Sequence, residues 1–315
     1  MNFQGLERIE DYKFYIDVAF RKATERSAQL RGSKIKGTRI EKSKKVEMVK
    51  LNAVKDVLSA RFERIIKGFP DLEGLPDFYR ELVKATVDYP ALKKSLGALK
   101  WAQTKVKEMH KKYSISIKKC QEINRINNYR REYYGRISSI LKQIKNELNY
   151  IDIARKIMKG FPAIKTGLKT VAIAGFPNVG KTTLLAKLTG STPDIQPYAF
   201  TTKGINVGYI KKDGKKEFQI LDTPGTLNRF EKMNNIEKVA FLALKMLAEK
   251  IIYVFDLTEP FPLDSQIKLY KKIKQLKKPT TIYLSKTDIL DKEIVNEFSE
   301  EYKIETLAQL KKSIS

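Results

Sequence analysis

Hydrophobic residues recur every three or four positions through the first half of the chain. Tyr12, Tyr15, Ile16 and Phe20, for example, fall on one stripe of a helix that is predicted over residues 11–30. Further helical patterns cover residues 41–66, a segment beginning near Pro76 and Asp77, residues 89–113 and residues 115–158. Because no convincing alternating strand occurs before residue 170, the pattern predicts an antiparallel helical bundle.

From residue 170 onward, short β-rich runs alternate with helical segments. The runs cover residues 171–175, 205–210, 217–222, 251–257 and 280–285. Such alternation predicts a largely parallel sheet with helices on both faces. Residues 159–170 contain Gly160, Pro162 and Gly167. They are therefore predicted to link a helical domain, residues 1–158, to an α/β domain, residues 171–315.

Positive charge is concentrated in the first part of the chain. The formal net charge is +26, and residues 1–170 contain 39 Lys and Arg residues against 19 Asp and Glu residues. This excess favours a polyanionic partner, either nucleic acid or an acidic membrane surface. No segment combines a continuous basic helical face with a bulky apolar one, so no membrane partner is expected. A lysine-rich proteome of a heat-adapted organism is the alternative, although such proteomes usually raise Glu together with Lys.

Cysteine usage and targeting signals narrow the cellular setting. Cys120 is the only cysteine in the sequence, so the chain has no internal disulfide, which fits a reducing compartment. The first 20 residues lack the apolar core of a signal peptide, and no apolar stretch reaches membrane-spanning length. We therefore expect a cytoplasmic protein.

A G-x-x-x-x-G-K-[ST] phosphate-loop motif follows the first predicted strand directly, at residues 175–182. Its glycines let the backbone curl around phosphate oxygens, and a helix that begins at Lys181 adds its positive dipole end. Lys181 is predicted to reach the β- and γ-phosphates, and the Thr182 hydroxyl to coordinate Mg²⁺. The predicted nucleotide-binding residues of this segment are Phe176, Pro177, Asn178, Val179, Gly180, Lys181, Thr182 and Thr183.

Two further motifs follow in order at the ends of predicted strands. Asp222 begins the sequence DTPG, where its carboxylate can hold Mg²⁺ and the Gly225 N–H can sense a γ-phosphate. Ser285 and Lys286 begin the sequence SKTD, in which the Asp288 carboxylate can accept both N1–H and N2–H₂ of guanine. Adenine lacks this donor pair, which argues against an ATPase or a small-molecule kinase. The predicted fold class is therefore an N-terminal all-α helical bundle followed by a C-terminal α/β P-loop GTPase domain with a mostly parallel sheet.

The segment between the first two motifs resembles a switch loop. Either Thr201 or Thr202 is expected to close over Mg²⁺ and the γ-phosphate, and the sequence does not decide between them. The predicted catalytic residues are Lys181, Thr202 and Gly225. Thr226 follows DTPG where many small GTPases have a Gln, so slow intrinsic hydrolysis is predicted. Asn178 is a candidate ligand for K⁺, which could neutralise transition-state charge, and the alternative is that it caps the loop.

The strings GFPNVGKTTLL, PYAFTTKG, DTPG and FPDLEGLPDFYREL resemble the Obg-related GTPases, specifically the nucleolar GTP-binding protein family in its short archaeal form. The resemblance implies a GTPase that converts GTP to GDP with Mg²⁺ and assists assembly of the large ribosomal subunit. Its helical domain would contact ribosomal RNA, and we expect a monomer away from the ribosome. The alternative is a nucleotide-binding RNA scaffold with little or no hydrolysis.

The sequence departs from this family at three places. Ser285 replaces the usual Asn, which removes an amide that contacts the purine and braces the phosphate loop. Glu305 and Thr306 stand where a Ser-Ala base-supporting loop is usual, and the sequence stops shortly after the G domain. We therefore expect weaker nucleotide affinity, with base selectivity preserved by Asp288.

Basic residues in two segments are the candidates for RNA contact. Arg31, Lys34, Lys36 and Arg39 lie in a glycine-bearing segment that is predicted to be a flexible loop. Arg130 and Arg131 lie on a long predicted helix together with Tyr129, Tyr133 and Tyr134. These tyrosines either stack on unpaired bases or belong to the core of the bundle, and both interpretations remain open.

Overall fold

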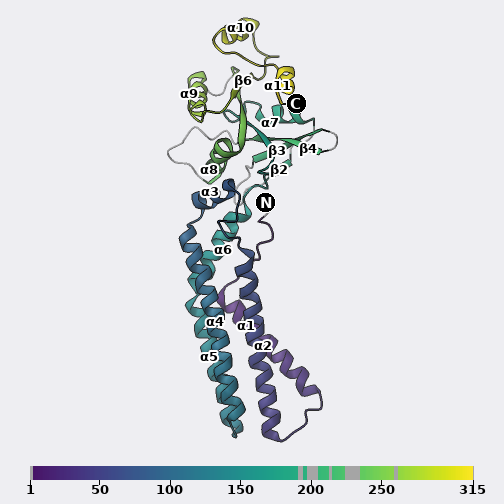
Figure 1. Cartoon of the computed structure of the whole chain (residues 1–315), viewed down its shortest axis with the longest axis vertical. Helices are drawn as coiled ribbons and strands as arrows, with labels where there is room; N and C mark the ends of the chain where they lie inside the picture. The colour runs from purple at the N-terminus through teal and green to yellow at the C-terminus, as the bar shows by residue number, and fades with distance from the viewer. Residues whose placement is uncertain are drawn as a thin grey trace. The chain divides into compact units, whose positions relative to one another are not determined.

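The computed structural model describes residues 3–190, 194–196, 205–212, 215–223, 235–258 and 262–314. The chain forms two compact units (Figure 1). The helical unit consists of residues 4–71 and 87–158, and the second unit of residues 1–3, 72–86 and 159–315. None of the helices within the described ranges is long and apolar enough to cross a bilayer.

The helical unit is an antiparallel bundle, as predicted. Its helices are α1 (Tyr12–Gly32), α2 (Arg39–Gly68), α4 (Tyr89–Lys119), α5 (Ile123–Gln143) and α6 (Lys145–Lys159). Helices α2, α4 and α5 lie side by side, and α1 packs on α2 and α5 (Figure 1). The core holds large side chains that are fully buried, among them Leu51, Leu58, Phe62, Leu99, Ile117, Ile126 and Tyr133.

Helix boundaries correct two of the predictions. The flexible basic loop expected over residues 31–39 is shorter, because α1 continues to Gly32 and Thr38 and Glu41 form a capping box that starts α2 at Arg39. The helix predicted over residues 115–158 is wrong, since its span contains the end of α4, all of α5 and most of α6. Ile117 and Ile126 are both fully buried on either side of the first turn. Both helices face one core, so the apolar period continues through the turn and hides it.

The second unit contains a sheet with the order β2-β3-β4-β1-β5-β6 among the described residues. Its strands are β1 (Lys169–Ala174), β2 (Asp194–Gln196), β3 (Ile205–Lys212), β4 (Lys215–Asp222), β5 (Ala248–Phe255) and β6 (Thr280–Leu284). Neighbours from β4 to β6 are parallel, whereas β2 and β3 pair antiparallel at one edge. The mostly parallel α/β prediction is therefore confirmed.

Helices of the second unit follow the strands along the chain. They are α7 (Lys181–Thr189), α8 (Asn235–Leu242) with a π-helical turn at Ala243–Leu247, α9 (Leu263–Lys274), α10 (Lys292–Glu301) and α11 (Leu307–Ile314). Helix α7 packs on β1, β3 and β4, and the π-helical turn packs on β1 and β5. This order places α7 directly behind β1, where the phosphate-loop motif lies.

Helix α3 (Asp77–Thr86) belongs to the second unit although it lies between α2 and α4 in the sequence. It begins at Asp77, as predicted, and packs on α8. The Tyr79 hydroxyl donates to the carbonyl oxygens of Pro162 and Ile164 at 2.8 and 3.0 Å. Lys238 of α8 donates from Nζ to the Ala85 carbonyl at 2.8 Å. These contacts attach α3 to the strand-containing unit.

Candidate nucleotide-binding site

The phosphate loop connects β1 to α7 through backbone conformations that favour glycine. Gly175 has φ of +149°, and a Cβ there would lie 2.6 Å from the Val254 carbonyl oxygen. Gly180, immediately before α7, has φ of +86°, and Asn178 also lies in the left-handed region at +62°. The loop therefore packs closely on β5 and delivers the free N–H groups of the α7 N-terminus to one point. Such a terminus favours an anion.

Lys181 is the buried cation of this loop. Its side chain is only 7% exposed, and Nζ donates to the Phe176 carbonyl oxygen at 2.5 Å. Burial lowers the pKa of the Lys181 ammonium to about 8, whereas the Asp222 carboxylate acts in the opposite direction. A negative group that approached Nζ would replace part of the lost hydration, so this position suits a phosphate.

A hydroxyl and a carboxylate meet beside the lysine, where β4 ends. Thr182 donates from Oγ1 to Asp222 Oδ2 at 2.5 Å, and Asp222 is 5% exposed. Both groups supply the hard oxygen ligands that Mg²⁺ prefers, so the pair fits this ion. Thr223 donates from its backbone N and from Oγ1 to the Ile173 carbonyl, which fixes the end of β4 against β1.

Asn206 is a member of this cluster that the sequence analysis missed. Its Nδ2 donates to Asp222 Oδ2 at 2.8 Å and lies 3.5 Å from Thr182 Oγ1. The contact arises because the antiparallel register of β3 and β4 pairs Asn206 with Asp222. No motif spacing reveals this partner, since the register is known only after the sheet is assembled.

The remaining predicted residues of the phosphate end either lie outside the described residues or differ in their exposure to solvent. Thr201, Thr202, Gly225 and Thr226 lie outside the described residues. Asn178 and Thr183 are exposed, as is Thr182, while Phe176 and Val179 are buried and Pro177 is partly buried. The Asn178 side chain makes no hydrogen bond to another described residue. The structure thus brings together Lys181, Thr182 and Asp222 from the predicted set.

Ser285 follows β6 and lies beneath the phosphate loop. Its side chain is buried, and its Oγ and backbone N both donate to the Phe255 carbonyl at 3.0 Å. Its Cβ lies 3.6 Å from the place that a Cβ would take at Gly180. The hydroxyl therefore ties β6 to β5 beneath the loop. Asp288, three residues further on, is exposed.

Lys286 forms an ion pair that the sequence analysis also missed. Its Nζ lies 2.6 Å from Asp256 Oδ2, and Asp256 is 2% exposed at the end of β5. Burial alone would raise the pKa of the Asp256 carboxyl, but hydrogen bonds from Lys286 and Thr258 outweigh it and lower that pKa. Gln266 of α9 bonds the backbone N and O of Asp256 at 3.1 and 2.7 Å. Asp256, itself held by Gln266, therefore fixes the position of Lys286, two residues before Asp288.

Glu305 and Thr306, at the position of the base-supporting loop, attach to β6 and α11. The Glu305 backbone N donates to the Ile282 carbonyl at 2.8 Å. Thr306 donates from N and Oγ1 to Gln309 Oε1, at the start of α11. The segment is therefore anchored to the strand that leads into Ser285.

The basic candidates of the helical unit divide into free and engaged cations. Arg31, Lys34, Lys36, Arg39 and Arg131 are exposed. Arg130 instead pairs with buried Glu47 at 3.0 Å and lies over the Tyr134 ring at 5.8 Å. This ion pair fastens α5 to α2, so Arg130 has a structural partner already.

Two of the three tyrosines of α5, Tyr133 and Tyr134, follow the core interpretation. Tyr133 is fully buried, so base stacking is wrong for it. Tyr134 stacks on Phe20 of α1, with ring centroids 4.1 Å apart and an interplanar angle of 10°. Tyr129 is partly buried, with the Arg125 guanidinium 6.0 Å from its ring centroid. The hydrophobic period of α5 thus reports bundle packing.

The fold and the phosphate loop define a P-loop GTPase domain attached to a helical domain. Residues 3–165 match the family model described as the NOG1 N-terminal helical domain, and residues 170–286 match that of the 50S ribosome-binding GTPase. The chain belongs to the nucleolar GTP-binding protein 1 family and is a GTP-binding protein.

Similarity to individual proteins extends over most of the chain. An uncharacterized protein of Methanocaldococcus jannaschii is 41% identical over 258 residues, which cover 81% of this chain and 72% of that protein. Nucleolar GTP-binding protein 1 of Drosophila melanogaster is 32% identical over 299 residues, covering 93% and 45%. The Candida glabrata protein of the same name is 34% identical over 266 residues, covering 83% and 41%. The match therefore spans less than half of these eukaryotic relatives.

Proposed function

We propose that this protein is a GTP-dependent switch that assists assembly of the large ribosomal subunit and contacts ribosomal RNA through its helical unit. The observation that carries the switch is the Thr182 hydroxyl held 2.5 Å from the Asp222 carboxylate beside buried Lys181. The basic first 170 residues support the RNA partner. The family description, 50S ribosome-binding GTPase, supports the ribosomal setting.

The phosphate end of the site would hold the triphosphate and Mg²⁺. Thr182 and Asp222 would hold the ion, with Asn206 fixing the carboxylate. When bound, Mg²⁺ supplies positive charge to the β- and γ-phosphate oxygens. Lys181 would place its ammonium on the same oxygens, and Thr201 or Thr202 together with Gly225 would complete the switch. The contacts of Lys181, Thr182 and Asp222 support their part in this proposal.

The base end of the site would select guanine through Asp288. The ion pair of Lys286 with Asp256 anchors the segment that carries Asp288 to the end of β5. Ser285 uses its hydroxyl at Phe255, so the purine loses the side-chain contact that an Asn would give. We therefore propose a guanine-selective pocket of reduced affinity.

Hydrolysis would be slow, because Thr226 offers no amide to orient the attacking water. Asn178 projects from the exposed loop with φ of +62° and would bind K⁺ as a source of positive charge. Hydrolysis rates in KCl and NaCl at equal ionic strength test this role. A faster rate in KCl that an Asn178→Ala variant abolishes supports it, and equal rates contradict it.

The first test of the function is titration of GDP, GTP and ATP into the full chain and into Asp288→Asn. The control is Asp291→Asn, which removes an exposed carboxylate three residues away. We expect guanine selectivity that shifts toward xanthine only in Asp288→Asn. No guanine preference in the parent would overturn the pocket. Guanine binding without single-turnover phosphate release would favour the scaffold alternative.

A further inference from the structure

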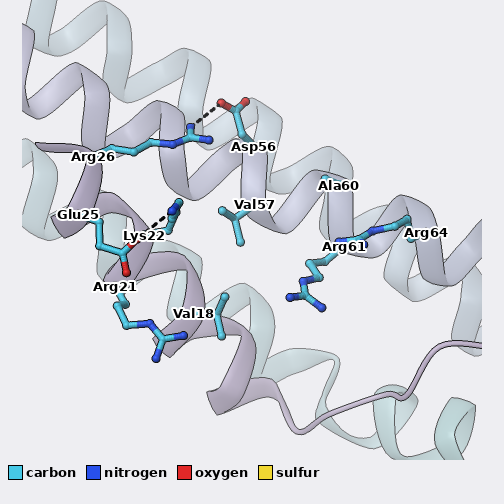
Figure 2. A pocket seen from close by; sticks show the side chains of 10 residues that line it. All are labelled: Val18, Arg21, Lys22, Glu25, Arg26, Asp56, Val57, Ala60, Arg61 and Arg64. Carbon is cyan, nitrogen blue, oxygen red and sulfur yellow. Dashed lines mark hydrogen bonds and ion pairs between the residues drawn. The ribbon is translucent and has the colours of Figure 1, made fainter. Parts of the chain in front are cut away.

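A hollow of about 500 Å³ that is open to solvent lies between α1 and α2 (Figure 2). Its apolar wall is formed by Val18 of α1 and by Val57 and Ala60 of α2. The remaining lining residues are charged: Arg21, Lys22, Glu25, Arg26, Asp56, Arg61 and Arg64. The lining therefore carries more cations than carboxylates, and it lies away from the basic segment of residues 31–39.

Most of the lining cations already have partners. Lys22 pairs with Glu25 at 2.9 Å, and Arg26 pairs with Asp56 at 3.3 Å. Arg64 pairs at 3.4 Å with Glu7, outside the lining. These pairs account for the carboxylates of the hollow.

Arg21 and Arg61 form no ion pair within the described part of the chain. The Arg61 side chain points from α2 toward the hollow beside Val57 and Val18, and Arg21 comes from the facing helix (Figure 2). Neither guanidinium group is engaged in an ion pair with a described residue, so both are available to an anion that enters the hollow. Guanidinium groups bind phosphate in bidentate geometry, which makes a phosphate the fitting anion.

We propose that this hollow binds one unpaired nucleotide of RNA. The phosphate lies between Arg21 and Arg61, and the ribose and base pack on the wall made by Val18, Val57 and Ala60. A volume of about 500 Å³ is within the range of small-ligand pockets. The proposal rests on the RNA contact of the proposed function and adds a place for it that no motif indicated.

The two carboxylates of the lining favour RNA over an acidic peptide. Glu25 and Asp56 would repel the acidic side chains of such a peptide, which offer them no hydrogen-bond donor. An RNA strand also carries one charge per nucleotide, but each nucleotide adds base amino groups or a 2′-hydroxyl that can donate hydrogen bonds to these carboxylates. The lining therefore offers arginines for the phosphate of a nucleotide and carboxylates for its hydrogen-bond donors.

The test measures binding of a labelled 12-nucleotide single-stranded RNA to the full chain and to an Arg21→Gln/Arg61→Gln double variant. The control is Lys107→Gln/Lys111→Gln, which removes the same charge from exposed positions of α4. We expect at least a tenfold loss in the first pair and less than threefold in the control. The slope of log affinity against log salt falls by about 0.7, because one phosphate contact is lost. Thermal unfolding of the double variant stays unchanged, because the two arginines lack partners.

A cross-link measurement is independent of any variant. RNA that carries 4-thiouridine is expected to cross-link the parent chain to peptides within residues 18–26 and 56–64. Equal losses of RNA affinity in the double variant and its control, or cross-links only to other residues, would show that the hollow is not the binding site. RNA binding by the chain would remain. Polyglutamate bound more tightly than RNA, and lost in the double variant, would assign the hollow to an acidic protein segment. No RNA binding by the parent would instead contradict the proposed function itself.

Discussion

The two units of this molecule differ in the burial of the cations that are predicted to bind phosphate. Lys181 of the second unit is buried, with its ammonium on the Phe176 carbonyl and its pKa lowered to about 8. Arg31, Lys34 and Lys36 of the helical unit are exposed to water. The buried lysine bears a desolvation cost of about 3 kcal/mol in its charged form, which a phosphate can relieve. Exposed cations bear almost none, so each gains little from one phosphate and the gain depends on salt.

The largest effect is expected from Lys181→Met, which removes the buried cation and keeps an unbranched side chain. GDP affinity is predicted to fall at least 100-fold, because about 3 kcal/mol of compensated desolvation is lost. Calorimetric titration of GDP measures it. Lys187→Met, at an exposed position of the same helix, is the control and should bind GDP normally. Similar affinity in both variants would place the phosphate elsewhere.

Asn206→Ala tests the cluster that positions Asp222. Loss of the 2.8 Å hydrogen bond frees the carboxylate to rotate, so Mg²⁺ affinity in the presence of GDP is predicted to fall about tenfold. Mn²⁺ as a paramagnetic probe of the same site gives a readout that does not depend on hydrolysis. Asn296→Ala, an exposed site on α10, serves as the control. If Mn²⁺ binds the two variants equally, Asn206 does not orient the ligand.

The pH dependence of GDP binding sharpens the contrast between the two units. Free Lys181 has a pKa lowered to about 8 by burial, and a bound phosphate raises that pKa, so binding takes up a proton near and above pH 8. Affinity is therefore full below about pH 7 and is predicted to fall severalfold as the pH rises to about 8.5. Calorimetry in buffers of different ionisation enthalpy measures the proton directly. A profile in Lys181→Met that matches the parent would remove this assignment.

The smallest effect is expected from exposed cations of the segment between α1 and α2. Lys34→Gln/Lys36→Gln is predicted to weaken RNA binding severalfold at low salt and to lower the salt slope by about 1.4, with GDP binding unchanged. Lys93→Gln/Lys94→Gln on α4 provides a control of equal charge. Filter binding over a salt series distinguishes them, and identical slopes for the two variants would leave the segment without a phosphate contact.

The phosphate loop and the position of Asp222 at the end of β4 could be predicted because each depends on a short stretch of sequence, and the fold class because its hydrophobic pattern runs along the whole chain. Asn206 and Asp256 could not, since their contacts require the register of β3 on β4 and the neighbouring ends of β5 and β6. The sequence did not reveal that α3 belongs to the second unit, because its apolar period would fit the core of either unit. For Tyr133 the sequence pattern allowed both base stacking and core packing, and only the structure, in which the side chain is fully buried, decides between them.

Helix α3 offers a route by which the nucleotide could act on RNA binding. It packs on α8, which follows the DTPG segment along the chain, and it is joined by the chain to α2 and α4. Lys238 ties the two helices through the Ala85 carbonyl. We propose that the response to the nucleotide is passed along the chain through α3.

The most direct test of a nucleotide-controlled RNA switch is the RNA affinity of the full chain with GDP and with a non-hydrolysable GTP analogue. Lys181→Met, measured in parallel, should show no dependence on the nucleotide. We predict affinities that differ at least fivefold between the two states, which corresponds to a coupling of about 1 kcal/mol. Equal affinities in a parent chain that binds both nucleotides would contradict the account, because a ligand shifts an equilibrium only through differential affinity.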